Sequence, residues 1–459
     1  MRAWRCFAAG LQRSHAGERS VHYWRGGGYL GTGRDPASAA DPRFLVTGAC
    51  GQIGAELIPF LRARVGVENV ISSDVKTNRT MLESGPFVYL DVLDKDNLAR
   101  VTIEHGITHI IHLATLLSGE GQGGGGPAGS HRGGGRGSRQ PWGGEGQAAG
   151  WWAVGERQPQ LALKINTSGI QNVLDLAAQH SLKVYSPSTI AVFGSNTPKD
   201  NTPNDTIMRP STMYGVTKVH SELLGHYYRD KFGVDFRSLR YPGIISANSP
   251  PGGGTTDYAV DIFHHALRSG HYTCFLEPDV ELPMMYMPDC LSATWKLMMA
   301  PRERLTHTTY NVAAVSFSPA QLAAAIRTLL PHFTITYTPD YRNEIAKTWP
   351  RSLDDSLARV DWGWQPHYDL LAMTRHMLLA LQAQASTSTS TSPPLTPSPS
   401  ASSTSTTAPA TPSPGLSSGA GGVGGGAGLG VGGGVGSAAA HERATLAAVT
   451  WPAEVVQPA

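Results

Sequence analysis

Charge, cysteine and long apolar runs are all scarce in this sequence. Charged residues make up 16% of its 459 residues, and the formal net charge is +2. Because no basic stripe lies in the central part of the chain, we do not expect a nucleic-acid partner. No apolar run reaches the roughly 18 residues that a membrane-spanning helix needs, so no membrane partner is expected either. These absences exclude collagen, coiled-coil and transporter architectures.

The four cysteines are scattered along the chain, at Cys6, Cys50, Cys274 and Cys290. They form no Cys-x-x-Cys pair, and no histidine cluster accompanies them. A disulfide framework, which holds together many small secreted proteins, is therefore not expected. A structural zinc site is not expected for the same reason, and we predict no metal.

Glycine and proline, by contrast, are abundant, with 53 and 32 residues. The excess lies in the N-terminus (1–41), in a glycine-rich insert (119–152) and in a tail (382–459) of Ser/Thr/Pro and then Gly/Ala/Val repeats. The rest of 42–381 amounts to about 300 residues, enough for one large domain with a full core. We expect the tail to be disordered, because it has too little apolar side chain to offset the entropy of ordering.

The N-terminal segment, residues 1–41, carries six arginines and three acidic residues. An arginine-rich, acid-poor N-terminus without a continuous apolar stretch is typical of an organelle transit peptide and not of a secretory signal. We expect a mitochondrial location, with the chloroplast and the cytoplasm as alternatives. The plainer interpretation is a disordered N-terminus with no targeting role.

The glycine-rich insert separates an expected strand, residues 109–114, from an expected helix, residues 161–180. Joining the two sides would leave an ordinary short connection. A structureless loop of such length is unusual inside a compact domain. We interpret the insert as a late insertion or as a retained intervening sequence that is translated.

Residues 43–245 alternate between short apolar runs and segments with apolar residues at helical spacing. The expected strands are 43–50, 69–75, 87–92, 109–114, 183–189 and 235–245, and the expected helices are 52–64, 94–105, 161–180 and 212–232. This repetition predicts an α/β fold of the Rossmann type, a doubly wound parallel sheet with helices on both faces. Beyond Pro250 the pattern loosens, which indicates a smaller C-terminal substrate-binding lobe over the carboxyl edge of the sheet.

Three glycines spaced three apart, Gly48, Gly51 and Gly54, lie between the first strand and the first helix. They allow a sharp turn, a close approach of a pyrophosphate and tight packing of helix on strand. The helix that begins at Gln52 and Ile53 offers free N–H groups to phosphates. Glycines also serve simple turns, but the strand before and the helix after them favour a dinucleotide site.

An acidic residue, Asp74, follows twenty residues after the last of these glycines, at the end of the second strand. A carboxylate there accepts hydrogen bonds from ribose hydroxyls and repels a 2′-phosphate, so the expected cofactor is NAD and not NADP. Asp91 and Val92 end the third strand and are expected beside the adenine. An equal alternative for Asp91 is a cap on the following helix.

Tyr214 and Lys218 lie four residues apart and therefore on one face of a helix. The ordinary pKa of tyrosine is about 10, too high for a base near neutrality, and a fixed ammonium group favours the phenolate. Many helices carry such a pair by chance. The strand 183–189, however, ends at the same edge in Ser188 and Thr189. Their hydroxyls can hydrogen-bond a substrate oxygen there. The alternative is that they only close a turn.

The segments TGACGQIG, SPSTIAVFG and YGVTK together resemble the extended short-chain dehydrogenase/reductase superfamily over residues 43–381, apart from the insert. LALKINTSGIQNVLDLA and PGGGTTDYAVDIF are similar to its L-threonine 3-dehydrogenases. The resemblance implies NAD-dependent oxidation of L-threonine at the 3-hydroxyl, giving L-2-amino-3-oxobutanoate without a metal. It also implies a homodimer formed through the helix that carries the Tyr–Lys pair.

The same resemblance implies roles for single residues. Tyr214 is the general base, Lys218 its partner on the nicotinamide ribose, and Thr189 binds the reacting hydroxyl. Asn166 supports a proton relay near Lys218, or else caps the start of its helix. Asp257 is the natural partner of the substrate ammonium, or else caps its own helix. The residues implied to line the cofactor are His112, Leu113, Ala114 and Ile244, and those implied to bind the amino acid are Ser118, Asn166, Thr189, Tyr214, Thr255, Thr256 and Asp257.

Three alternatives stay open on the sequence alone. A nucleotide-sugar epimerase or dehydratase shares the scaffold, but it would need a C-terminal lobe that grips a nucleotide. An inactive NAD-binding protein would result if the insert after Ser118, beside the expected substrate pocket, spoils the site. A low-complexity interaction protein would explain the tail but not the set of motifs.

Overall fold

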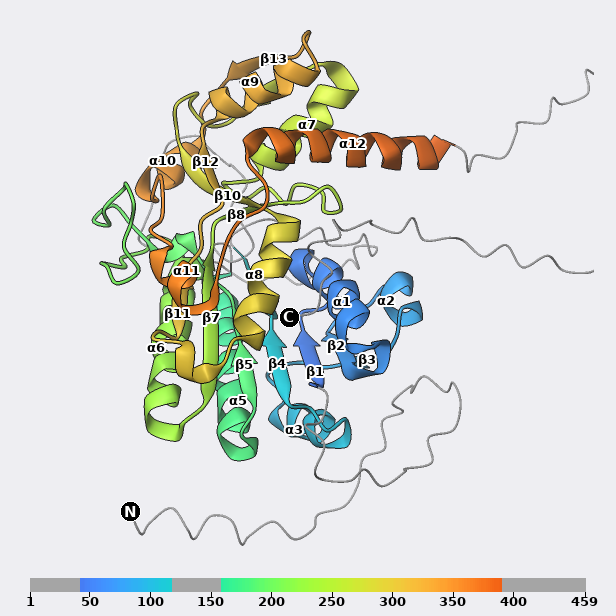
Figure 1. Ribbon diagram of the computed structural model, residues 1–459, viewed down its shortest axis with the longest axis vertical. Coiled ribbons are helices and arrows are strands. Elements are labelled where there is room, and N and C mark those ends of the chain that lie inside the picture. Colours follow the sequence, from blue (N-terminus) through green and yellow to red (C-terminus); the bar gives the residue numbers. More distant parts are fainter. Residues whose placement is uncertain (1–41, 118–157, 390–459) are drawn as a thin grey trace, which may run out of the picture.

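The computed structural model describes residues 42–117 and 158–389 of the chain. The N-terminal segment, the insert together with Ser118, and the tail beyond Thr389 lie outside these described residues. Figure 1 shows a large α/β domain and, above it, a smaller lobe built from later parts of the chain.

The central sheet has eight strands, ordered β11-β7-β5-β4-β1-β2-β3, with β6 paired to β7 off this path. All its pairings are parallel, and Phe44 of β1 stands opposite Val70 on one side and His109 on the other. The chain starts in the middle of the sheet and winds outward both ways, which confirms the doubly wound parallel sheet. The strands are β1 (Phe44–Thr47), β2 (Val70–Asp74), β3 (Phe87–Tyr89), β4 (His109–His112), β5 (Lys183–Tyr185), β6 (Ser188–Thr189), β7 (Asp235–Tyr241) and β11 (Thr309–Asn311).

Helices cover both faces of this sheet, because neighbouring residues of a strand point to opposite sides. In β1, Phe44 and Val46 belong to one buried cluster and Leu45 to another. The first face carries α1 (Gln52–Val65), α8 (Met287–Met299) and α11 (Ser356–Trp362), and the second carries α3 (Lys95–Glu104), α5 (Pro159–His180) and α6 (Met213–Phe232). The short elements η1 (Val67–Asn69), α2 (Arg79–Glu83), η2 (Ile190–Val192) and η3 (Arg302–Arg304) complete this domain.

Two expected strands are each broken by a proline at the carboxyl edge of the sheet. Residues 183–189 divide at Pro187 into β5 and β6, and residues 235–245 divide at Pro242 into β7 and β8 (Gly243–Ile245). Proline has no N–H to donate to a strand pairing, so the strand is interrupted there: β6 still pairs with β7, whereas the chain after Pro242 takes a new partner. As a result β8 leaves the large sheet and pairs with β10 of the lobe.

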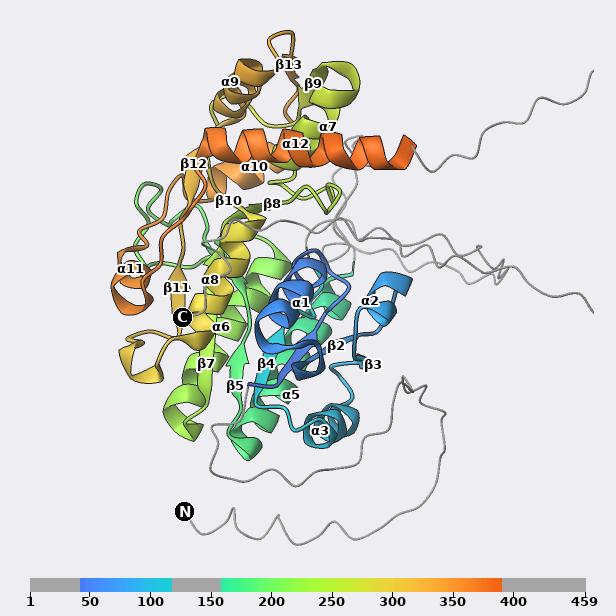
Figure 2. The same ribbon diagram turned by 45° about the vertical axis from the view of Figure 1, so that its right-hand side comes forward.

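The lobe combines two small sheets with helices packed around a shared apolar cluster. In Figure 2 its long helix α12 runs across the lobe beside α7 and α9. In the described ranges no helix is long and apolar enough to cross a membrane. The elements are α7 (Tyr258–Ser269), β9 (His271–Cys274), β10 (Leu282–Tyr286), β12 (Val315–Phe317), α9 (Pro319–Leu329), β13 (Thr334–Tyr337), α10 (Tyr341–Thr348) and α12 (Leu370–Thr389).

The C-terminal part of the chain is more than a cap on the sheet. Between stretches of the lobe, α8 packs on the large domain, and β11 joins the large sheet as its edge strand beside β7. The last helix, α12, continues past the expected boundary at Leu381 to Thr389. Leu378 and Leu381 are buried and residues 382–386 are exposed, but the Gln384 side chain donates to the Ala247 carbonyl and to the Asn248 side chain, so contacts with the domain continue past Leu381.

A buried arginine joins the returning helix α8 to the sheet. Arg237 of β7 is 1% exposed, and its guanidinium donates two hydrogen bonds of 2.8 Å to the carboxylate of Asp235. Its remaining nitrogen donates to the carbonyls of Leu297, Met298 and Ala300 at the end of α8. The last carbonyls of a helix lack the usual N–H partners of the next turn, so Arg237 helps to cap α8, together with the Ala300 N–H on Leu297 and Lys183 on Met298.

We therefore expect Arg237→Leu to lower the free energy of unfolding by about 3 kcal/mol, because it removes the buried ion-pair partner of Asp235 and three hydrogen bonds to the end of α8. Urea denaturation followed by circular dichroism measures the change. Arg302 is the matched control, since it donates to the Gly233 carbonyl at the surface. Arg302→Leu should cost less than about 0.5 kcal/mol, and equal effects of the two substitutions would contradict this account.

Candidate functional site

The glycine turn after β1 is shaped by two close approaches. Gly48 has a φ of +74°, and a Cβ on it would lie 2.6 Å from the backbone nitrogen of Ala114. A Cβ on Gly54 would lie 2.5 Å from the carbonyl oxygen of Gly48. Both positions therefore admit only glycine without a backbone shift. Gly51 is different, because its nearest such contact is 3.3 Å, so packing alone does not require glycine there.

The start of α1 beside this turn is suited to a dinucleotide phosphate. Its N-cap, Gly51, supplies no side-chain hydrogen bond, so the first N–H groups of the helix, at Gln52 and Ile53, face outward unsatisfied by a cap. Asp74 at the end of β2 lies next to the turn, since its carboxylate accepts from the Cys50 backbone nitrogen at 3.0 Å. Burial and this carboxylate raise the pKa of the Cys50 thiol. The donors and the carboxylate fit the phosphates and ribose of NAD.

Asp91 does not cap the next helix. The N-cap of α3 is Asp94, whose side chain accepts from the Asn97 backbone nitrogen. The carboxylate of Asp91 accepts instead from the Leu93 backbone nitrogen at 2.9 Å and is exposed to solvent. Val92 is buried, and its carbonyl accepts from the Asn172 side chain of α5. The structure thus leaves Asp91 accessible at the edge where the adenine is expected.

The end of β4 lies against the glycine turn. Leu113 donates its backbone N–H to Thr47 of β1 at 2.9 Å, and Ala114 is the residue that Gly48 approaches. His112, just before them, is buried and hydrogen-bonded to the Thr47 hydroxyl at 2.9 Å. Burial, and then the charge of Lys218, lower the pKa of His112 to about 3. His112 is therefore a neutral ring close to the Lys218 ammonium.

The Tyr–Lys helix begins beside the same edge because of two residues. Thr212 is the N-cap of α6, with its hydroxyl accepting from the Gly215 backbone nitrogen at 3.1 Å. A Cβ on Gly215 would lie 2.3 Å from the Ala191 carbonyl, so this glycine allows α6 to lie directly on η2. Tyr214 consequently occupies the first turn of α6, and Lys218 lies one turn further along the same face.

The structure brings Tyr214, Lys218 and Thr189 together. The Lys218 ammonium lies 5.6 Å from the centre of the Tyr214 ring and donates to the Pro187 carbonyl at 2.8 Å. Burial raises the pKa of Tyr214 to about 12, and a hydrogen bond with the Thr189 side chain opposes the rise. Burial likewise lowers the pKa of Lys218 to about 8, opposed by the charge of Glu222. From the sequence we expected the Lys218 ammonium to lower the pKa of Tyr214. In the chain alone it does not, because burial keeps that pKa above its ordinary value.

Asn166 lies inside α5, well after its N-cap Gln158, so it does not cap the helix. Its amide nitrogen donates to the Thr217 hydroxyl at 3.0 Å, beside Lys218 in sequence. The same side chain accepts from the Leu116 backbone nitrogen at 2.8 Å and donates to the Leu116 carbonyl at 3.1 Å. Asn166 thus connects the segment after β4 with α6, while no direct bond to Lys218 is formed.

The loop expected to bind the amino acid lies beyond β8. Thr256 packs on Gly243, since a Cβ on Gly243 would lie 2.8 Å from that of Thr256, next to Ile244 in β8. Asp257 occupies the N-cap position of α7 without capping it by its side chain. Its carboxylate instead accepts from the backbone nitrogens of Gly252 and Gly254, at 2.6 and 2.9 Å.

A cavity of about 280 Å³ opens beside Asp257, and Tyr214 and Lys218 do not line it. Its lining residues are Pro251, Gly252, Gly253, Asp257, Asp261, Phe275 and Arg342. Thr255 lies in the same loop, and Ser118 falls outside the described residues. Within the described ranges no group of three or more His, Cys, Asp or Glu residues is placed to hold a metal ion.

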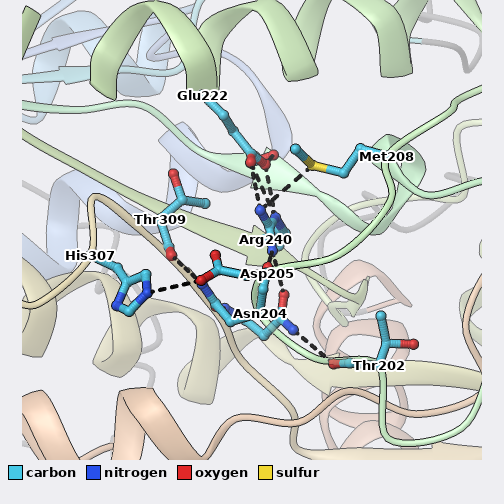
Figure 3. A network of polar contacts seen from close by, with 10 residues as sticks. Thr202, Asn204, Asp205, Met208, Glu222, Arg240, His307 and Thr309 are labelled. Atoms are coloured by element: carbon cyan, nitrogen blue, oxygen red, sulfur yellow. Dashed lines mark hydrogen bonds and ion pairs between the residues drawn. The ribbon is translucent and has the colours of Figure 1, made fainter. Parts of the chain in front are cut away.

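The sequence did not reveal a buried ion pair between α6, the helix that carries Tyr214 and Lys218, and the strand β7. Glu222 of α6 and Arg240 of β7 are 5% and 4% exposed, and their closest atoms are 2.8 Å apart. Figure 3 shows the Arg240 guanidinium between the Glu222 carboxylate and the loop that carries Asn204 and Met208. The position of Glu222, one turn beyond Lys218 on the same helix face, was the available signal, whereas its partner on a strand could not be identified from spacing.

Comparison with known proteins gives the class. The family described as NAD dependent epimerase/dehydratase matches residues 44–130 and 147–313. The chain belongs to this family, which confirms the expected superfamily and agrees with the choice of NAD. Among its relatives, the mitochondrial L-threonine 3-dehydrogenase of Bos taurus is 45% identical over 344 residues, or 74% of this chain and 83% of the relative.

Solved structures extend the likeness. L-threonine dehydrogenase from Phytophthora infestans is 52% identical, with a TM-score of 0.66 over 74% of this chain and 99% of that one. The enzyme from Clostridium difficile is 41% identical, with a TM-score of 0.67 over 75% and 98%. A UDP-glucose 4-epimerase of Thermotoga maritima, 18% identical with a TM-score of 0.60 over 75% and 99%, shares the fold alone.

The contrast between two glycines of the turn is testable. Gly48→Ala should lower the melting temperature, because the new Cβ meets the backbone of Ala114 and alanine is strained at a positive φ. Gly51→Ala should keep the melting temperature within about 2 °C and weaken NAD binding about 10-fold or more, since its methyl group faces the position of the pyrophosphate. Differential scanning fluorimetry and calorimetric titration with NAD measure the two effects. Unchanged NAD affinity in Gly51→Ala would show that the pyrophosphate does not pass over this glycine.

Proposed function

We propose that this protein oxidises L-threonine at its 3-hydroxyl with NAD, giving L-2-amino-3-oxobutanoate and NADH. The observation that carries the proposal is the grouping of Tyr214, Lys218 and Thr189 at the carboxyl edge, next to the glycine turn and Asp74. The relatives named L-threonine 3-dehydrogenase, 45–52% identical over about three quarters of the chain, support the same substrate. A nucleotide-sugar epimerase is disfavoured, because the likeness to a solved one is of fold only.

The chain's own residues supply a base and its positioning. Tyr214 takes the proton of the 3-hydroxyl, while Thr189, hydrogen-bonded to Tyr214, orients that hydroxyl. Lys218 is held by the Pro187 carbonyl and keeps a positive charge beside the phenol. Bound NAD would supply the hydride acceptor for C3 and a positive charge that favours the phenolate of Tyr214. A charge in this dry site stabilises the phenolate strongly, which is what a phenol with a pKa of about 12 needs.

The remaining site residues belong to the same proposal. Gly48, Gly51, Gln52, Ile53 and Gly54 bind the pyrophosphate. Asp74 binds the adenosine ribose, and Asp91 and Val92 flank the adenine. Leu113, Ala114 and Ile244 line the nicotinamide half of the cofactor, and the residues that bind the amino acid are Ser118, Asn166, Thr255, Thr256 and Asp257. For Asp257 this requires that its carboxylate keep one oxygen free, and its two loop hydrogen bonds share a single oxygen, Oδ2.

Tyr214→Phe should lower kcat with L-threonine by about 10³-fold, because it removes the general base. The wild-type rate should rise from pH 6 towards pH 8, where Lys218 begins to lose its proton, since the phenolate fraction of a group with a raised pKa grows with pH, and the variant should lose this rise. NADH absorbance measures both, with D-threonine, L-serine and UDP-glucose alongside. Tyr228→Phe is the matched control, a phenol on the same helix bonded to Asp175. Equal turnover in Tyr214→Phe, or turnover with UDP-glucose alone, would contradict the proposal.

We propose the division into a transit peptide (1–41), the NAD-binding domain (42–381) and a low-complexity tail (382–459).

The insert is tested by the same assay on the full chain and on a chain that lacks 119–152. Activity only without the insert would make it an artefact or an off-switch. Mass spectrometry of the native protein for the tryptic peptide 140–157 shows whether the insert is made. Silence of both chains towards L-threonine, with NAD still bound, would favour the inactive NAD-binding protein.

A homodimer through α6 is supported by an apolar stripe on its outer face. Val216, Leu223 and Tyr227 are 46%, 59% and 50% exposed, and their spacing places them on one side of the helix. Exposed apolar side chains grouped in this way mark interaction surfaces. A second copy of the chain is the partner we propose. One solved relative, 38% identical to this chain, is described as monomeric.

Leu223→Glu should therefore shift the molar mass from dimer to monomer, because it places a charge in the apolar contact. Light scattering after size-exclusion chromatography measures it at several protein concentrations. Leu379→Glu on α12 is the control, since Leu379 is equally exposed at 58% but lies outside the stripe. A wild-type monomer, or the same mass in both variants, would overturn the dimer.

A mitochondrial location rests on the arginine-rich segment 1–41 and on the relatives from Bos taurus and Sus scrofa, both named mitochondrial. Import into isolated mitochondria, compared between the full chain and one starting at residue 42, tests it. Equal import of the two chains would show that residues 1–41 are not the targeting signal.

A further inference from the structure

Three consecutive residues at the carboxyl edge attach to three residues of α6. The Pro187 carbonyl accepts from Lys218, and the Thr189 side chain is hydrogen-bonded to Tyr214. Between them, the hydroxyl of Ser188 donates to the Glu222 carboxylate in a short hydrogen bond. The segment Pro187–Thr189 thus contacts both Tyr214 and Lys218, and its central residue, Ser188, is itself held by Glu222.

Glu222 is in turn held rigidly by Arg240. The guanidinium contacts both carboxylate oxygens, with donor–acceptor distances of 2.8 to 3.2 Å. Its other nitrogen donates to the Asn204 carbonyl at 2.6 Å and to the Asn311 side chain at 3.1 Å. Figure 3 shows this arrangement, in which Asn204 also reaches the backbone of Thr309 in β11. The carboxylate is therefore anchored to the loop that leads into α6 and to the edge of the sheet.

We propose that Glu222 is a positioning residue for the reaction: through Ser188 it fixes the segment Pro187–Thr189, and with it the places of the Tyr214 phenol and the Lys218 ammonium. This inference rests on the proposed function. A buried ion pair contributes little net stability compared with apolar residues of similar volume, so its value here lies in the fixed geometry it gives. Displacements of about 1 Å at a reacting centre are enough to slow a reaction by about 100-fold.

Glu222 lies four residues after Lys218 and therefore one turn away on the same face of α6, so its carboxylate acts on the Lys218 ammonium. The groups that face Lys218 are His112 from β4, which is neutral, and Tyr214 and Glu222 from its own helix. Those that face Glu222 are Arg240 from β7, Ser188 from β6 and Lys218. A carboxylate near an ammonium favours the protonated ammonium, so neutralising Glu222 lowers the pKa of Lys218. The alkaline limit of activity then moves to lower pH.

The decisive variant is Ser188→Ala, which cuts the link to Glu222 and leaves the Glu222–Arg240 pair whole. We expect kcat with L-threonine to fall about 10-fold or more, with KM values for threonine and NAD within about 2-fold of wild type. Ser188→Thr keeps the hydroxyl and should restore most of kcat. Tyr310→Phe is the matched control, because it removes another buried hydroxyl–carboxylate bond, to Asp361, away from the site. It should lower the melting temperature and leave kcat unchanged.

Hydrogen exchange of the peptide covering residues 188–193 gives a readout without substrate. Ser188→Ala should speed exchange in this peptide, and Tyr310→Phe should not. If wild type does not turn over L-threonine, the proposed function fails, while the exchange experiment still decides whether Glu222 fixes the segment. Unchanged kcat in an active Ser188→Ala protein, or unchanged exchange in an inactive one, would overturn the inference.

Glu222→Gln tests the charge separately, since glutamine still accepts the Ser188 hydrogen bond. We expect the alkaline limb of its kcat profile to move down by about 1 pH unit, whereas Ser188→Ala leaves that limb in place because no charge changes. Should the unpaired Arg240 prevent folding of Glu222→Gln, the double variant Glu222→Gln/Arg240→Met is compared with Arg240→Met, so that the two proteins differ only in the charge at position 222. A limb that stays at the wild-type pH in the folded variant would show that Glu222 does not act on Lys218.

Discussion

The direction of the strands is the constraint on which the rest of the structure depends. Because every pairing of the large sheet is parallel, all strand ends that carry chemistry meet at one edge. The glycine turn, Asp74, Leu113 and Thr189 come from four different strands and need no other device to meet there. Prolines then interrupt the strands at this edge, at Pro187 and Pro242. The first exposes a carbonyl for Lys218, and the second sends β8 into the lobe that faces the site.

Burial, more than the charge of Lys218, governs the electrostatics of the Tyr–Lys pair. Removing a phenol from water penalises its charged form, and this effect raises the pKa of Tyr214 to about 12 despite the nearby ammonium. The same effect lowers the pKa of Lys218 to about 8, so the ammonium itself is held only by compensating partners. A Tyr-x-x-x-Lys pair is therefore not a working base by itself. A site of this kind becomes active when a cofactor's positive charge occupies the same dry space, which couples cofactor binding to base strength.

The sequence predicted local features well and side-chain partners poorly. The alternation of strands and helices, the glycine turn and the start of α3 near residue 94 depend on residues close together in the chain, so spacing is enough to find them. The role of Asp257 could not be predicted, because an acid before a helix is compatible with capping, ligand binding and the loop closure that the structure shows. The pairing of Glu222 with Arg240 brings together a helix and a strand, and only the packed fold determines that contact.

The position of the insert separates its effect on the fold from its effect on the site. Asn166 fastens the backbone of Leu116 to α5 on one side of it, and α5 begins at Pro159 on the other, so both ends are anchored by the domain itself. In general, lengthening the connection between two anchored ends from a few residues to about 40 costs only about 2 kcal/mol in loop-closure entropy. A domain with this core can absorb such a cost, and therefore an intact fold carries no information about activity. Leu116, just before the insert, is bonded to Asn166, which also donates to Thr217 beside Lys218, so an effect of the insert on the site is separate from this cost in stability and is measured by activity.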